Sequence, residues 1–161
     1  MAKKLFFLFF LVSCTSSNAS VEVNNEISQT TITEALAVAL DSEDILIQIL
    51  DAYKSFSSSP NESLDIIWNF AHPNNQAVTG PKERFALMLT SEPYDLIIDL
   101  KDYSYKVVFE SDENIHYEVN FINQNDSYLV LTWVFEKTLC YNKPCWRTIG
   151  VSEPQFLGSG I

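Results

Sequence analysis

The spacing of apolar residues changes after Tyr94, and this change restricts the fold more than any other feature of the sequence. Before Tyr94 apolar residues recur every three or four positions, most clearly at Ile45, Leu46, Ile49, Leu50, Tyr53 and Phe56. After Tyr94 they alternate with other residues, as Tyr105, Val107 and Phe109 do. The first spacing indicates amphipathic helices, and the second indicates strands with one buried face. The sequence therefore predicts helices followed by strands, an order typical of an α+β domain.

Three helices are expected in the first half of the domain. The first carries the apolar stripe Ile45–Phe56, and the second starts at Ser59-Pro60, where serine can cap the helix and proline suits its first position. A loop is expected over 71–78, after which Thr79-Gly80-Pro81 starts the third helix. Thr31-Ile32-Thr33-Glu34 has the spacing of a capping box, so a helix can also begin there. The spacing leaves open whether that helix continues into the stripe.

Four antiparallel strands are expected after the helices. Two alternating segments, Tyr105–Glu110 and His116–Phe121, form the first pair. The segment Leu129–Phe135 carries apolar residues on both faces, so it is expected at the centre of the sheet. Residues Cys145–Val151 are expected to form the last strand, and 155–161 a tail. The expected fold is thus α+β, with about three helices packed on a sheet of about four strands.

The first 13 residues have the pattern of an export signal. Lys3 and Lys4 are followed by the apolar run Leu5–Val12, which is far shorter than the about 20 residues needed to span a bilayer. Leu11-Val12-Ser13-Cys14 resembles the bacterial lipobox, whose cysteine is lipidated before cleavage. Cys14 would then anchor the domain in the cell envelope, on the periplasmic side. In the alternative, cleavage after Ser17-Asn18-Ala19 releases a soluble periplasmic protein.

The charge of the chain limits its partners. It has 21 acidic and 10 basic side chains, a net charge of −11, so nucleic acid is not an expected partner. Anionic lipid headgroups would repel the domain, and membrane attachment would depend on the acyl chains at Cys14. Residues 14–30 are rich in Ser, Asn, Thr and Glu and are expected to form a flexible polar tether.

Two cysteines remain in the exported domain, Cys140 and Cys145. An oxidising compartment favours a disulfide between them, and Tyr141–Pro144 has the residues of a turn. The alternative is two free thiols. No metal site is expected, because His72 and His116 are distant in sequence and a second cysteine pair is absent from the sequence.

A series of short motifs extends from about Ile45 to Pro154. In order they are Gln48, Leu50, Ala52, Phe70-Ala71-His72-Pro73-Asn74-Asn75, Thr79-Gly80-Pro81, Arg84-Phe85, Met88, Pro93-Tyr94 and Trp146-Arg147-Thr148-Ile149-Gly150-Val151. Together they resemble the domain-of-unknown-function 4864 family, a branch of the nuclear-transport-factor-2-like superfamily found in bacteria and plants. The resemblance implies a cone-like α+β domain over 31–154, with a curved antiparallel sheet around the helices and an apolar pocket at its open end. It implies no activity, and His72 stands where the family usually has Asn or Ser.

A pocket of this kind could be lined by aromatic residues and their neighbours in the motifs. The candidates are Trp68, Arg84, Phe85, Met88, Tyr94, Trp133 and Trp146. Core packing is the alternative role for the aromatic residues. For Arg84, the alternative is an ion pair with Glu83, Glu92 or Asp95, while its functional role would be to bind an anionic group of a ligand.

The sequence does not converge on a reaction. The leading hypothesis is a non-catalytic domain, without cofactor or metal, that binds a small apolar ligand or an envelope protein. A protein partner predicts an exposed apolar patch and no enclosed cavity. The alternative is an enzyme of the isomerase, dehydratase or hydrolase type that uses His72 or Asp51. That alternative requires one of these side chains to point into a cavity, with a second polar group within hydrogen-bond reach.

Overall fold

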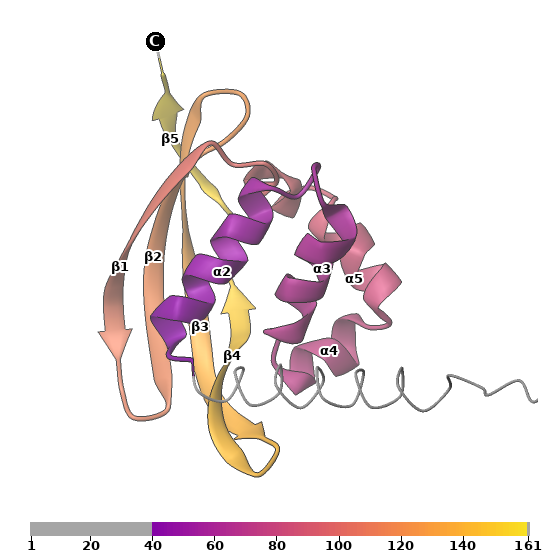
Figure 1. The fold of residues 1–161 in the computed structure, drawn as a ribbon. Coiled ribbons are helices and arrows are strands. Elements are labelled where there is room, and N and C mark those ends of the chain that lie inside the picture. Colours follow the sequence, from indigo (N-terminus) through magenta and orange to yellow (C-terminus); the bar gives the residue numbers. More distant parts are fainter. Residues whose placement is uncertain (1–39, 161) are drawn as a thin grey trace, which may run out of the picture. The chain divides into compact units, whose positions relative to one another are not determined.

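The computed structural model describes residues 40–160 (Figure 1). The expected signal peptide 1–13, the lipidation site Cys14, the tether 14–30 and the capping box at 31–34 lie outside the described residues. Within 40–160, no helix is both long and apolar enough to cross a membrane.

The described residues form an α+β domain in which helices precede strands, as the change in apolar spacing predicts. The helices are α2 (Ser42–Lys54), α3 (Pro60–Asn69), α4 (Pro73–Thr79), α5 (Lys82–Leu89) and the short 3-10 helix η1 (Tyr94–Ile97). The strands are β1 (Asp102–Glu110), β2 (Asn114–Ile122), β3 (Ser127–Cys140), β4 (Lys143–Val151) and β5 (Gln155–Ser159). They form one antiparallel sheet in the order β1-β2-β3-β4, and β5 also pairs with β3. In Figure 1, α2 lies across the sheet while α3, α4 and α5 form a group beside it.

Helix α2 packs its apolar stripe against the sheet (Figure 1). Asp41 caps the helix, since its side chain accepts a hydrogen bond from the Asp44 amide at 2.9 Å, and the helix with the stripe therefore begins at Ser42. Four stripe residues are fully buried, Ile45, Leu46, Ile49 and Leu50. The core-facing residues of β3 are Leu129, Leu131, Trp133 and Phe135, each no more than 3% exposed. The prediction that this strand is central is confirmed, because β2 pairs along one edge and β4 and β5 share the other.

Two elements differ from the sequence expectations. The expected loop 71–78 contains α4, which is capped when His72 Nδ1 accepts a hydrogen bond from the Asn74 amide at 3.1 Å. The expected tail 155–161 contains β5, which pairs with Ser127–Val130 of β3. Strand β3 is longer than β4, so this end of β3 lies beyond the residues that β4 pairs, and β5 takes up its edge hydrogen bonds.

The alternation predicted for β1 does not continue to its end. Val107, Val108 and Phe109 are each about half exposed. A bulge between Val107 and Phe109 interrupts the pairing with β2, which changes the side to which the following side chains point.

Cys140 and Cys145 form a disulfide, as expected. The turn between them is tighter than expected, because Lys143 and Pro144 already belong to β4 and pair with β3. Tyr141 and Asn142 form the two-residue turn, with φ of 51° and 64°, and a positive φ at both positions is typical of a type I′ hairpin. The disulfide thus joins the two strands directly beside their turn.

Reduction of the disulfide should lower the free energy of unfolding by about 2 kcal/mol, because the bond removes loop entropy from the unfolded chain. The melting temperature followed by circular dichroism should fall by roughly 5–10 °C in reductant. A variant with both Cys140→Ser and Cys145→Ser should melt at the reduced value and be insensitive to reductant. An unchanged melting temperature on reduction would contradict a stabilising role for the bond.

Candidate functional site

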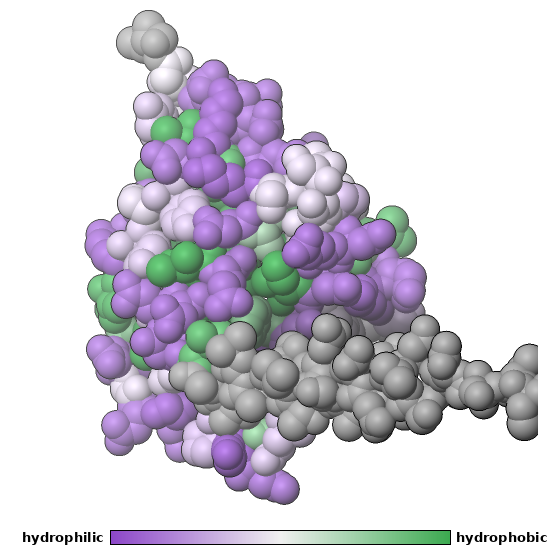
Figure 2. Space-filling view, viewed as in Figure 1, coloured by the Kyte–Doolittle hydropathy of each residue, from purple (hydrophilic) through white to green (hydrophobic). Residues whose placement is uncertain are grey.

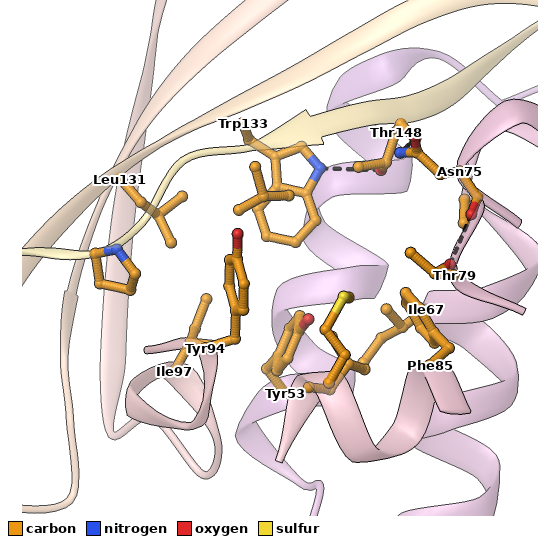
Figure 3. A pocket seen from close by; sticks show the side chains of 15 residues that line it. Tyr53, Ile67, Asn75, Thr79, Phe85, Tyr94, Ile97, Leu131, Trp133 and Thr148 are labelled. Atoms are coloured by element: carbon orange, nitrogen blue, oxygen red, sulfur yellow. Dashed lines mark hydrogen bonds between the residues drawn. The ribbon is translucent and has the colours of Figure 1, made fainter. Parts of the chain in front are cut away.

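A cavity of about 210 Å³ lies between the helices and the sheet (Figure 3). Its walls come from every helix of residues 40–160 and from β3 and β4. The apolar lining consists of Ile67, Ala71, Phe85, Met88, Leu89, Ile97, Leu131, Trp133, Val151 and Pro154, and the polar lining consists of Tyr53, Asn75, Thr79, Tyr94 and Thr148. The cavity is thus mainly apolar, with a small number of neutral polar groups, a composition typical of ligand sites.

The cavity brings together four of the seven pocket candidates. Phe85, Met88, Tyr94 and Trp133 line it. Phe85 and Met88 share one face of α5 because they are three positions apart, and Leu89 extends that face by one turn. This face of α5 therefore contributes apolar and aromatic side chains to the cavity, as the sequence predicts.

The other three candidates lie outside the cavity lining. Trp68 stands behind the wall and packs on Phe85, with 5.1 Å between ring centroids. Arg84 is exposed, and none of the acids considered for it is within ion-pair distance, although all three are among the described residues. Trp146 lies toward the disulfide hairpin, where Lys137 Nζ is 4.7 Å from its ring centroid. These residues neighbour the site residues in sequence but face other directions.

The β4 wall of the cavity is organised by Thr148. Its hydroxyl oxygen accepts a hydrogen bond from Trp133 Nε1 at 3.0 Å, which fixes the indole ring across the cavity. The backbone of Thr148 also pairs with the chain before α4: its amide donates to Phe70 O and its carbonyl accepts from the His72 amide, both at 2.8 Å. The start of α4 is therefore held at the edge of the sheet.

Asn75 and Thr79 of α4 add to this wall. Asn75 Nδ2 donates to the carbonyl oxygens of Thr148 at 3.1 Å and Ile149 at 2.9 Å, and the Thr79 hydroxyl donates to the backbone oxygen of Asn75 at 2.6 Å. Gly80 then allows the close turn into α5, because a Cβ atom there would lie 2.5 Å from Gln76 O. Neither Asn75 nor Thr79 was predicted as a pocket residue from the sequence, and Asn75 lies in the segment expected to be a loop. The available signal was their place in the quoted motifs, since Asn75 ends one motif and Thr79 begins the next.

Tyr53 and Tyr94 present hydroxyl groups to the cavity. Tyr53 is only 4% exposed, and its hydroxyl has no hydrogen-bond partner within 40–160. Burial, with a contribution from nearby Tyr94, raises the pKa of Tyr53 above its usual range, so this hydroxyl keeps its proton at neutral pH. The Tyr94 hydroxyl also lacks a partner in this part of the chain, and in Figure 3 it points into the cavity toward Trp133.

The two residues considered for catalysis lie elsewhere. His72 is buried, but its Nδ1 is occupied in capping α4 and its Nε2 lies 4.0 Å from Glu136 Oε2. Asp51 is exposed on α2 and accepts a hydrogen bond from the Tyr103 hydroxyl at 2.9 Å. Burial and then this hydrogen bond raise the pKa of Tyr103 to about 12. Asp51 lines a separate, open groove with residues of α2 and α3, so neither residue reaches the cavity.

The lining residues described here include no acid, base or histidine. Elsewhere in 40–160, no group of three or more His, Cys, Asp and Glu side chains is placed to hold a metal ion. What the cavity offers is apolar surface and neutral hydroxyl groups, which can bind and orient a ligand.

No family model, curated protein or solved structure matches this chain. The function is therefore argued from the geometry of the cavity.

Replacing Tyr53 with phenylalanine should leave the free energy of unfolding within about 0.5 kcal/mol of the original, or raise it, because a hydroxyl without a partner contributes no hydrogen bond to the fold. Tyr117→Phe is the matched control: Tyr117 is equally buried, but its hydroxyl bonds Ser42 Oγ at 2.9 Å. It should cost about 1 kcal/mol. Urea unfolding followed by tryptophan fluorescence measures both values, and an equal loss in the two variants would contradict the prediction.

Proposed function

We propose that this chain is an exported, lipid-anchored, non-catalytic domain that binds a small apolar ligand in the cavity between its helices and sheet. The observation that carries the proposal is a partly open cavity whose lining is mainly apolar, with a few uncharged polar groups. A protein cavity of about 150 Å³ lined by apolar residues binds benzene. A cavity of about 210 Å³ suits a ligand somewhat larger than benzene, such as a substituted single ring.

The proposal assigns the domain to the cone-like, nuclear-transport-factor-2-like class. Helices on one face of an antiparallel sheet support it, as do pairing irregularities in β1, β4 and β5, because bulges bend strands. The motifs that resemble the domain-of-unknown-function 4864 family also support it. Residues from six of them meet in the cavity, although the motifs extend from Phe70 to Val151: Asn75, Thr79, Phe85, Met88, Tyr94 and Thr148 are examples.

A ligand is favoured over a protein partner because the apolar lining is inside the domain. A docking surface for a protein would require a continuous apolar patch. On the face seen in Figure 2, hydrophobic residues form small groups separated by hydrophilic ones. The enzyme alternative gains no support from the site, because neither His72 nor Asp51 lines the cavity.

The proposed location is the cell envelope, on the periplasmic side, with the lipid on Cys14 as the anchor. The lipobox-like segment ending at Cys14 supports this location. A disulfide between Cys140 and Cys145 agrees with this location, since such bonds persist in oxidising compartments. Cleavage after Ala19 would place the same domain in the periplasm as a soluble protein.

Filling the cavity should abolish ligand binding without unfolding the domain. Val151→Phe adds a ring to the lining beside Trp133, with which Val151 pairs, and we expect at least a tenfold loss of affinity for isopropylbenzene, measured by nuclear magnetic resonance titration. Val107→Phe, on the exposed part of β1, is the control and should bind as the original chain does. If the original chain fails to bind isopropylbenzene, or if Val151→Phe binds it equally well, the cavity is not an apolar ligand site.

The anchor is tested by metabolic labelling with a radioactive fatty acid. The chain should take up the label in a bacterial host, and Cys14→Ser should take up none, because the lipid is attached through the cysteine sulfur. Cys145→Ser serves as the control and should keep the label. Label retained in Cys14→Ser would refute the lipobox assignment, and a chain that begins after Ala19 would show the soluble form.

A further inference from the structure

The hydroxyl of Tyr53 opens into the cavity and has no hydrogen-bond partner among the described residues. The side chain is 4% exposed, lines the cavity, and has no hydroxyl partner among residues 40–160. A phenol hydroxyl is a better donor than acceptor, and a ligand that covers this donor without accepting its proton pays the cost of burying it unpaired. The fold itself gives no reason for this hydroxyl, since phenylalanine would fill the same space.

Two further hydroxyl groups face the same cavity. Tyr94 has no hydroxyl partner in the described part of the chain. Thr148 accepts from Trp133 Nε1, and none of the described residues accepts the Thr148 proton in turn. A threonine hydroxyl has one proton, so the bond from Trp133 leaves that proton free to point into the cavity. Tyr53, Tyr94 and Thr148 thus give the cavity three available donors.

The charge of the lining limits which acceptor these donors can take. No lysine or arginine is among the described lining residues, so a carboxylate or phosphate in the cavity would lose its water without gaining a cation. A carbonyl oxygen has two lone pairs and no net charge. It can therefore accept from two hydroxyl groups while the rest of the ligand contacts the apolar lining.

We infer that the cavity recognises a neutral carbonyl compound, such as a small ketone or ester, whose oxygen accepts hydrogen bonds from Tyr53 and Tyr94, with Thr148 as a third donor. This inference rests on the proposed function and adds the polar group of the ligand to it. Trp133 is a positioning residue, because its bond to Thr148 orients that hydroxyl.

The test compares three probes of similar size on the purified full chain: acetophenone, isopropylbenzene and benzoate. Nuclear magnetic resonance titration gives the dissociation constant of each. Acetophenone should bind about tenfold more tightly than isopropylbenzene, the difference expected from one or two neutral hydrogen bonds. Benzoate should bind more weakly than acetophenone, because the site offers no cation.

The variants show which hydroxyl groups are responsible. Tyr53→Phe should remove most of the preference for acetophenone and leave the affinity for isopropylbenzene within about twofold. Tyr94→Phe should have the same kind of effect and serves as the second variant if Tyr53→Phe does not fold. Tyr103→Phe is the control, since the Tyr103 hydroxyl bonds Asp51 outside the cavity, and it should change neither affinity.

The outcomes separate this inference from the proposed function. If acetophenone and isopropylbenzene bind equally, or if both tyrosine variants keep the preference, the carbonyl inference is wrong and apolar binding stands. Tighter binding of benzoate than of acetophenone would also overturn it. If none of the probes binds, the proposed function fails, and the inference fails with it.

Discussion

The pairing of β3 along both of its edges is the constraint on which the other elements depend. Its backbone groups are taken up by β2 on one side and by β4 and β5 on the other. Its core-facing side chains then define the surface on which the helices can pack. Over the first part of α2 this packing is complete, because Ile45, Leu46, Ile49 and Leu50 are fully buried. Toward β4 it is incomplete, and the cavity lies there.

Hydrogen bonds fix the position of α4, which forms one wall of the cavity, against β4, which forms another. Thr148 joins β4 to the chain before α4, and Asn75 joins α4 back to β4. These bonds fix α4 at the edge of the sheet, and the turn at Gly80 then sets where α5 begins. Helix α5 presents Phe85 and Met88 toward Trp133 without filling the space between them. An interior held only by apolar contacts would gain by closing such a space.

Apolar spacing predicted the helices with a clear stripe, the central strand and the helix-to-strand order. It failed for α4, which has seven residues, no buried residue and a histidine as its cap. It failed for β5 because the pairing of that strand depends on the length of β3, a tertiary feature. The cavity was predicted only in part for a related reason. Tyr53 lies on the same stripe as Ile49 and Leu50, and spacing cannot tell a residue that fills a core from one that borders a cavity.

The charge of the chain and the chemistry of the cavity favour the same class of ligand. The net charge of −11 gives the whole protein a field that repels anions at a distance. Inside the cavity, Tyr53, Tyr94 and Thr148 offer protons but no described lining residue offers a positive charge. An anion is therefore disfavoured both on approach and on burial, while a purely apolar molecule leaves buried donors without acceptors. A neutral molecule with one hydrogen-bond acceptor carries no charge to be repelled or buried, and it gives the hydroxyl groups an acceptor. The Tyr53 hydroxyl, which has no partner among the described residues, distinguishes this cavity from a packing defect in an apolar core.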